Sequence, residues 1–195
     1  MKSRLQRVGR AFGLTLAVLA LALVAFHVAV RRAARLMPPT VTPPPMQASQ
    51  AANGVRRFGP AYARKVGSIL QVGLSGTPET IGYSHARLLY PEMVENEGIL
   101  LGRFKDQVPV RAARSLLLDL AQLRYRDVNQ QMSPERLREI AAGAQGFQPD
   151  PYAELFPTFQ RFVYLNALYD ISLSFEGSPL IGCTTFTFDG AATAD

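Results

Sequence analysis

One long apolar run dominates the hydrophobic pattern near the N-terminus. Residues 11–30 carry no formal charge, and only Thr15 and His27 interrupt the apolar side chains. At about 1.5 Å per residue, a helix over this run is about 30 Å long and matches the hydrocarbon core of a bilayer. The pattern predicts a transmembrane anchor over residues 11–30, behind a basic tail over residues 1–10, with His27 at the membrane interface.

A cleaved signal peptide is the alternative to a retained anchor. Its apolar region is usually about 7–15 residues long and ends in a small-x-small cleavage site. This run is longer and is followed directly by Arg31 and Arg32, which favours retention. Four basic residues precede the run and three follow it, a bias that favours a cytoplasmic N-terminus. We expect a single-pass protein of the cell (inner) membrane, with its soluble part facing the periplasm or exterior.

A proline-rich stretch follows the anchor and separates it from the rest of the chain. Five prolines fall within residues 37–46, a density that favours an extended polyproline spacer holding the domain off the membrane. Small polar residues follow over residues 47–53. We therefore predict a linker over residues 31–53 and a folded part over residues 54–195.

The folded part combines one early strand with helices. The run Ser68–Leu74 is apolar and bounded by glycines, as is typical of a strand. Helix starts are indicated by Thr77-Pro78, Pro109 and Ser133-Pro134, and a further helix is expected over residues 157–172. Pro91 is expected to kink or end the first helix, and Gly143 to cap the third.

The pattern changes near the end of the sequence. Residues 183–188 are β-branched or aromatic, and Asp189-Gly190 after them is a strong hairpin signal, with residues 191–195 as the return strand. An isolated two-stranded hairpin is marginal in water. We expect an α/β (α+β) domain that is truncated here, and that a missing C-terminal part or second subunit completes the sheet.

Charge and composition exclude several functions. Seven of the 21 Lys and Arg residues flank the apolar run, so fourteen remain against fifteen Asp and Glu, and the rest of the chain is near −1. A nucleic-acid-binding domain would carry excess positive charge on its folded module, so we expect no nucleic-acid partner. Two histidines and one cysteine without tight spacing predict neither a metal site nor a cofactor.

Cys183 is the residue most suggestive of chemistry. Gly182-Cys183 stands where a loop meets a predicted strand, so the thiol is a candidate exposed nucleophile at a sheet end. The alternative is a small apolar core residue, which is what most lone cysteines are.

Four separated segments add a family resemblance. They are Gly76–His85, Leu137–Ala144, Leu165–Asp170 and Gly182–Phe186, the last reading Gly-Cys-Thr-Thr-Phe. In this order they resemble the acyl-CoA:6-aminopenicillanate acyltransferase and phospholipase B-like group of N-terminal-nucleophile hydrolases. The resemblance covers roughly residues 69–195. It implies an αββα sandwich, of which this sequence would contain the helical pro-region and the first β-hairpin.

The resemblance also implies a reaction. The thiol of Cys183 would attack the carbonyl of Gly182, and hydrolysis of the thioester would free an α-amino group that can accept the thiol proton. The processed protein would then hydrolyse a small-molecule amide or transfer its acyl group, with Thr184 in support. Ala86 stands where family members commonly have glycine, and the family's Arg-Asn-x-Asp-like strand would lie beyond residue 195. We therefore expect the segment alone to be inactive.

His85 and the whole function each have an alternative. His85 is a candidate supporting residue for Cys183, but it shares a helical face with Ile81 and Leu88, which favours a hydrogen-bonded core histidine. Glu135 and Glu139 lie one turn apart among arginines and indicate an ordinary solvated helix face. The alternative to an enzyme precursor is a non-catalytic, membrane-anchored helical interaction module or an inactive fragment.

Overall fold

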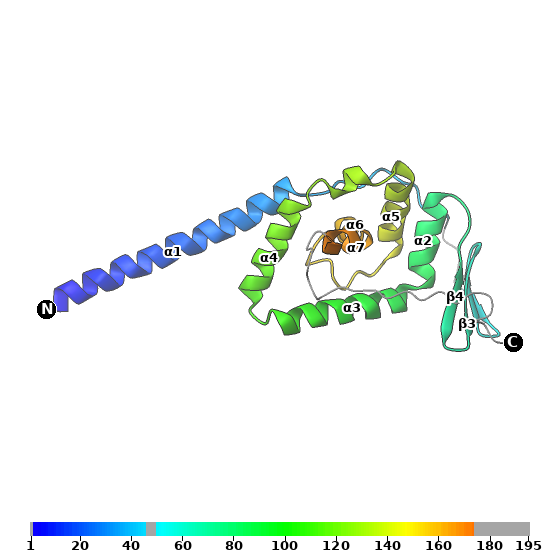
Figure 1. The fold of residues 1–195 in the computed structure, drawn as a ribbon, viewed down its shortest axis with the longest axis horizontal. Coiled ribbons are helices and arrows are strands. Elements are labelled where there is room, and N and C mark those ends of the chain that lie inside the picture. Colours follow the sequence, from blue (N-terminus) through cyan, green and yellow to red (C-terminus); the bar gives the residue numbers. More distant parts are fainter. Residues whose placement is uncertain (1, 46–49, 174–195) are drawn as a thin grey trace, which may run out of the picture.

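A computed structural model describes residues 2–45 and 50–173 (Figure 1). These residues form one long N-terminal helix and a domain that combines helices with a small antiparallel sheet. The expected α+β character is therefore confirmed. The predicted hairpin over residues 183–195, which would begin the N-terminal-nucleophile sandwich, lies outside the described residues.

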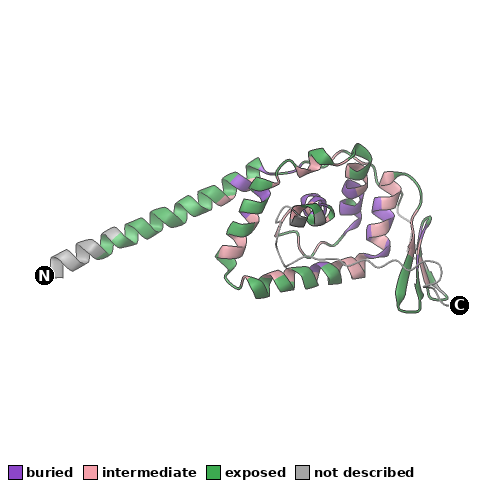
Figure 2. Ribbon diagram, in the orientation of Figure 1, coloured by how far each residue is buried: buried purple, intermediate pink, exposed green. Residues whose placement is uncertain are grey.

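Helix α1 spans Lys2–Ala33 and projects away from the domain (Figure 1). Its segment Phe12–Ala33, 22 residues long, is apolar and long enough to cross a membrane. Most described residues of α1 are exposed, as Figure 2 shows, so the domain does not bury this apolar helix. The predicted anchor over residues 11–30 thus coincides with an apolar helix that continues three residues further.

The proline-rich segment that follows α1 is not the free spacer expected from its composition. Residues 35–45 have no helix or strand, as predicted, but Ala34 and Leu36 are only 1% and 6% exposed. Gln160 donates a hydrogen bond to the carbonyl of Ala34 and accepts one from the N–H of Leu36. Val41 packs against the core. Ala34 and Leu36 before the prolines and Val41 between them therefore fasten the segment to the domain.

A four-stranded antiparallel sheet follows, in the order β1–β2–β3–β4. Its strands are β1 Gln50–Ala52, β2 Val55–Phe58, β3 Ala61–Val66 and β4 Ile69–Gly73. The strand predicted over Ser68–Leu74 is confirmed as β4, whereas the three strands before it were not predicted, and the sheet begins at Gln50, within the predicted linker. The turn from β1 to β2 is Asn53-Gly54, with φ of 51° and 74°, a left-handed pair that suits a tight hairpin.

Three helices, α2 to α4, follow the sheet along the chain. They span Pro78–Leu88, Tyr90–Gln107 and Arg111–Arg124. Thr77 caps α2 by accepting a hydrogen bond from the N–H of Thr80, as predicted. As predicted, the first helix ends just before Pro91: α2 stops at Leu88, and Pro91 stands in the first turn of α3, where its missing N–H costs no hydrogen bond. Helix α3 as a whole was not predicted.

A short 3₁₀ helix, η1 Val128–Gln131, precedes the last three helices, α5 Pro134–Gly146, α6 Thr158–Asn166 and α7 Leu168–Leu173. The Ser133 cap of α5 is confirmed by its hydrogen bond from the N–H of Arg136. The predicted single helix over residues 157–172 is divided at Ala167, which ends α6.

Gly143 lies inside α5 and not at its end, so the predicted cap is wrong. Helices α2 and α5 pack closely at Gly82 and Gly143. A Cβ atom added at Gly82 would lie 1.9 Å from the carbonyl oxygen of Glu139, and one at Gly143 would lie 3.4 Å from the carbonyl oxygen of Gly82. Glycine at these positions therefore allows the two backbones to touch.

The core fills the space between these helices. Phe147 and Val163 have no exposed surface, and the ring of Phe147 lies 5.2 Å, between centroids, from both Tyr90 and Phe162. A second apolar cluster joins Phe58 and Ala61 of the sheet to Tyr83 of α2. The sheet is thus attached to the helices through α2.

Candidate functional site

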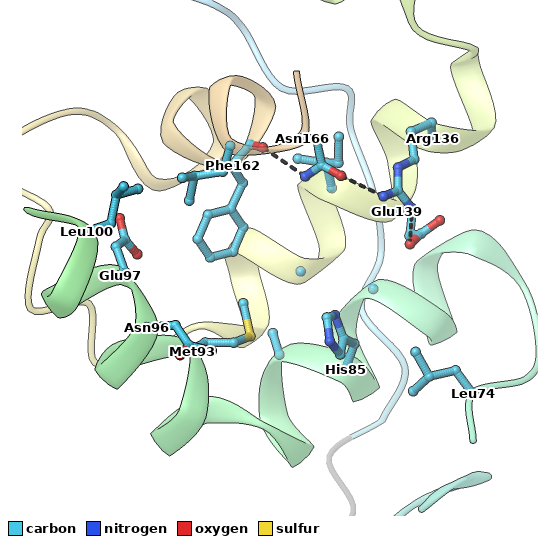
Figure 3. Close-up of a pocket in the computed structure, with 15 residues that line it drawn as sticks. Leu74, His85, Met93, Asn96, Glu97, Leu100, Arg136, Glu139, Phe162 and Asn166 are labelled. Atoms are coloured by element: carbon cyan, nitrogen blue, oxygen red, sulfur yellow. Dashed lines mark hydrogen bonds and ion pairs between the residues drawn. The ribbon is translucent and has the colours of Figure 1, made fainter. Parts of the chain in front are cut away.

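A cavity of about 490 Å³ opens between helices α2, α3, α5 and α6 (Figure 3). Its wall combines apolar side chains with several polar and charged ones. In Figure 3, His85 and Leu74 lie at one end and Glu97 and Leu100 at the other. The lining residues are Leu74, Gly82, His85, Ala86, Met93, Asn96, Glu97, Leu100, Arg136, Glu139, Ile140, Gly143, Phe162, Leu165 and Asn166.

His85 lines this cavity from α2 and is half-buried. Among the described residues, no side chain or backbone group is hydrogen-bonded to its ring. It is therefore a cavity-wall residue there, and not the hydrogen-bonded core histidine that its spacing favoured. Burial lowers the pKa of His85; the carboxylate of Glu139 opposes this effect and Arg136 adds to it. A neutral imidazole at pH 7 has one ring nitrogen free to accept a proton.

A polar network forms the rim of the cavity. Arg136 donates to the carboxylate of Glu139 at 2.6 Å and to the side-chain oxygen of Asn166 at 2.5 Å. Asn166 in turn donates to the carbonyl of Phe162 at 2.8 Å, as the dashed lines in Figure 3 show. The network joins α5 to α6 and fixes a guanidinium and an amide at the cavity mouth.

The sequence predicts an ordinary solvated helix face at Glu135 and Glu139. In the structure, both carboxylates pair with neighbouring arginines. Glu135 lies 3.6 Å from Arg138. Arg138 also pairs with Glu79 of α2 at 2.8 Å, so this face additionally connects two helices.

Glu97 is the cavity residue that the sequence analysis missed. It is 6% exposed and forms an ion pair with the Nε atom of Arg161. Arg161 also donates two hydrogen bonds to Asp150, at 2.8 and 2.9 Å, so one buried guanidinium holds two carboxylates. The signal in the sequence is that Glu97 shares a helical face with the apolar residues Met93, Leu100 and Phe104.

Burial raises the pKa of Glu97; the adjacent Arg161 opposes the rise and Asp150 adds to it. A carboxyl group with a raised pKa at a cavity wall is a candidate proton donor or acceptor. Structural ion-pair networks shift pKa values in the same way, and Arg161 packs on the rings of Phe147, Tyr152 and Phe162, which marks the pair as part of the core.

The residues predicted to carry the chemistry, Gly182, Cys183 and Thr184, lie outside the described residues, so their placement relative to His85 stays a prediction. Within residues 2–45 and 50–173, no group of three or more His, Cys, Asp or Glu side chains is arranged to hold a metal ion.

Comparison of the chain with protein-family models, curated proteins and solved structures found no match. The residues and geometry of the chain are therefore the basis for its function. Segments that are far apart in the sequence meet at the cavity of about 490 Å³. The cavity receives Gly82 and His85 from one of the four segments that carry the family resemblance, Glu139, Ile140 and Gly143 from the second, and Leu165 and Asn166 from the third.

Proposed function

We propose that this chain is the membrane-anchored precursor portion of a cysteine N-terminal-nucleophile enzyme. The precursor would cleave itself between Gly182 and Cys183 and would then hydrolyse an amide or transfer its acyl group. The supporting observation is that segments Gly76–His85, Leu137–Ala144 and Leu165–Asp170, far apart in the sequence, line one cavity of about 490 Å³.

The chemistry of the cavity suits an acyl compound. Met93, Ile140 and Phe162 supply apolar surface for an acyl chain. Arg136 and Asn166 are bonded to each other, to Glu139 and to Phe162, and a guanidinium and an amide have further N–H groups and an oxygen lone pair for a polar group such as an amide. Ligand sites commonly combine an apolar wall with a few positioned polar groups.

The proposed cleavage is balanced within the chain. The thiol of Cys183 adds to the carbonyl of Gly182, the bond to the Cys183 nitrogen breaks, and that nitrogen leaves as an amine. Water then hydrolyses the thioester, so that Gly182 ends in a carboxylate and Cys183 begins a new chain. The free amine, with a pKa of about 8 in an unperturbed peptide, then serves as base for the thiol.

Intact-mass spectrometry of the native gene product tests this proposal. We expect wild type to give two fragments that separate between Gly182 and Cys183, and Cys183→Ala to give one uncut chain with the same circular dichroism. Cys183→Ser retains a nucleophilic hydroxyl and is the matched control, expected to cut more slowly than wild type. An uncut wild type, together with full amidase activity in Cys183→Ala, would overturn the proposal and favour an interaction module.

We further propose that α1 is a retained anchor and that the domain lies outside the cytoplasm. Supporting observations are the 22-residue apolar helix and the excess of basic residues before it. N-terminal sequencing of membrane-extracted protein is expected to begin at or near Met1, and protease added to spheroplasts is expected to digest the domain. A start within residues 27–50, or full protection, would contradict the anchor or its orientation, respectively.

A further inference from the structure

A second cavity, of about 430 Å³, lies where α1 meets the domain. Its lining is strongly basic: it includes Arg31, Arg32 and Arg35 and no carboxylate. The remaining lining residues are His27, Val28, Gln122, Leu155, Phe156, Pro157 and Gln160.

The arginines of this cavity lack anionic partners. Among the described residues, no carboxylate lies within ion-pair distance of Arg31, Arg32 or Arg35. The Nε atom of Arg31 is buried without a hydrogen-bond partner, and its guanidinium lies 5.9 Å from the ring centroid of Phe156. The nearest buried carboxylate on α4, Asp119, is held by His27 at 2.6 Å. The cavity therefore presents positive charge and an unsatisfied donor, which an anion would complement.

An apolar cavity of about 300 Å³ adjoins the basic one. The two share Gln122, Leu155 and Phe156 in their walls. Beyond them, the apolar cavity is lined mainly by hydrophobic side chains of α3, α4, α6 and α7, namely Leu100, Leu101, Phe104, Leu118, Ala121, Tyr125, Tyr164, Leu165, Leu168 and Ile171. A basic cavity that adjoins an apolar one fits an anionic amphiphile better than a small hydrophilic anion, because an amphiphile has both a charge and an apolar chain.

The position of the basic cavity identifies the source of the amphiphile. Arg31 and Arg32 stand in the last turn of α1, at the end of the segment that is long enough to cross a membrane. Helix α4 packs against this end of α1, on the side from which α1 projects (Figure 1). The outward face of α4 is apolar, with 38–47% exposure at Leu116, Leu117, Leu120 and Leu123.

Helix α4 also buries the opposite kind of side chain. Asp119 and Gln122 are each 2% exposed, so α4 turns polar groups inward and leucines outward. This inversion is expected of a helix whose outer face meets lipid. With Phe12–Ala33 across a bilayer, as proposed above, the basic cavity at its end would lie at the level of the lipid head groups.

We propose that the basic cavity binds the phosphate of an anionic phospholipid, with an acyl chain in the apolar cavity beside Phe156. Arg31 and Arg35 would donate to the phosphate oxygens, as arginine does in other phosphate sites. The proposal rests on the proposed anchor, and the arginines that would hold the phosphate do not line the cavity of the proposed reaction.

The test is ligand binding to the full chain in neutral detergent, followed by native mass spectrometry. The probes are phosphatidylglycerol, phosphatidylcholine of the same chain length, and glycerol phosphate. We expect phosphatidylglycerol to bind at least about tenfold tighter than either of the others, because only it offers both the net charge and the acyl chain. Equal binding of glycerol phosphate would overturn the lipid assignment in favour of a free phosphate.

Arginine variants make the site assignment falsifiable. The double variant Arg31→Gln/Arg35→Gln removes no ion pair among the described residues, so the fold should persist, and we expect phosphatidylglycerol binding to fall about tenfold or more. Arg31→Lys/Arg35→Lys keeps the charge and should restore part of the binding. The matched controls are Arg10→Gln, at the other end of the span, and Arg111→Gln on α4. Unchanged binding in the double Gln variant, or an equal loss in the controls, would overturn the proposal.

The placement of the acyl chain is tested separately by Ala121→Trp, whose larger side chain would fill the apolar cavity from α4. We expect this variant to lose the preference for phosphatidylglycerol over glycerol phosphate while binding of glycerol phosphate stays the same. A preserved preference would overturn the placement of the acyl chain. Cys183→Ala binds the lipid normally if the site is independent of catalysis, and N-terminal sequencing tests the anchor by itself, so the two proposals fail distinguishably.

Discussion

Helices α2 and α4 both carry apolar residues, but they place them in opposite environments. In α2, Tyr83, Ala86 and Leu88 are buried, and Gly82 lets the backbone touch α5. In α4, Asp119 and Gln122 are buried, while the leucines of residues 116–123, apart from half-buried Leu118, are exposed (Figure 2). On the side of α2, called the closed side below, the helix is in backbone contact with α5. On the side of α4, called the open side, leucine side chains are exposed beside the apolar helix α1.

The difference shows that amphipathicity does not by itself tell which face of a helix is internal. Helix α2 follows the rule for soluble proteins because its partner α5 and the sheet cover its apolar face. Helix α4 departs from that rule, because its inward polar side chains find partners. His27 holds Asp119, and Gln160 donates to Gln122 at 3.3 Å. With these polar side chains inward, the leucines of α4 lie on its outward face.

The largest effect is expected where the two sides meet, at Arg161. Glu97 lines the cavities on both sides, and Arg161→Leu would leave Glu97 and Asp150 buried without a cation. Removing one partner of a buried ion pair costs about 3–5 kcal/mol, which lowers the melting temperature by roughly 10 °C in a chain of this size. Thermal unfolding in mild detergent measures it.

The control for this prediction is Arg138→Leu, whose partner Glu79 is less buried. We expect a much smaller loss than in Arg161→Leu, because exposed ion pairs contribute little. Equal losses in the two variants would contradict the view that Arg161 joins the two sides.

The next effect concerns the closed side. Gly82→Ala places a Cβ atom 1.9 Å from the carbonyl oxygen of Glu139, so α2 and α5 must separate. We expect a loss of about 1–3 kcal/mol, measured by thermal unfolding. In α3, Gly102→Ala meets nothing within 4 Å and should instead stabilise the protein by about 0.5–1 kcal/mol, because alanine favours helix. If both variants were neutral, the backbone contact would be unnecessary.

A smaller effect tests how α4 is held on the open side. The pair between Nδ1 of His27 and Asp119 joins positions 92 residues apart. We expect His27→Ala and Asp119→Ala each to cost about 1–2 kcal/mol, and the double variant to cost less than their sum by about 1 kcal/mol. Additive losses would mean that the two side chains act independently.

The smallest effect is the pH dependence that comes from His85. Because burial lowers its pKa in the folded state, the unfolded chain binds more protons below the ordinary value of 6.5. Its contribution to stability is therefore present above pH 6.5 and is lost as the pH falls through the lowered pKa. We expect His85→Asn to flatten the acid side of the melting-temperature profile between pH 4 and 7. Identical slopes in variant and wild type would argue against a neutral, half-buried His85.

Parts of the fold could be predicted because they depend on local signals. Thr77-Pro78 and Ser133-Pro134 place a capping hydroxyl before a residue that needs no N–H partner, and α2 and α5 begin at those prolines. The sheet was mostly missed because its strands are short and rich in arginine and lysine, as in β2 and β3. Such strands are stabilised by pairing, which a local pattern does not reveal.

The candidate site shows the same division. The family resemblance singled out His85 and the segments around Gly82, Glu139 and Asn166, and these residues meet at the cavity. Glu97 was missed because its importance depends on Arg161, which stands on a different helix. The apolar neighbours of Glu97 on α3 favour burial, but only the partner Arg161 shows how a carboxylate can be buried there.

By itself, the sequence determined the length of the apolar helix and the starts of α2 and α5. These properties follow from hydrophobic length and from hydrogen bonds within one turn. Tertiary structure alone decided that Gly143 is a helix contact and that the leucines of α4 face outward. It also decided that two cavities meet at Phe156. Each of these depends on which surfaces meet across long separations in the chain, and short-range preferences carry no information about that.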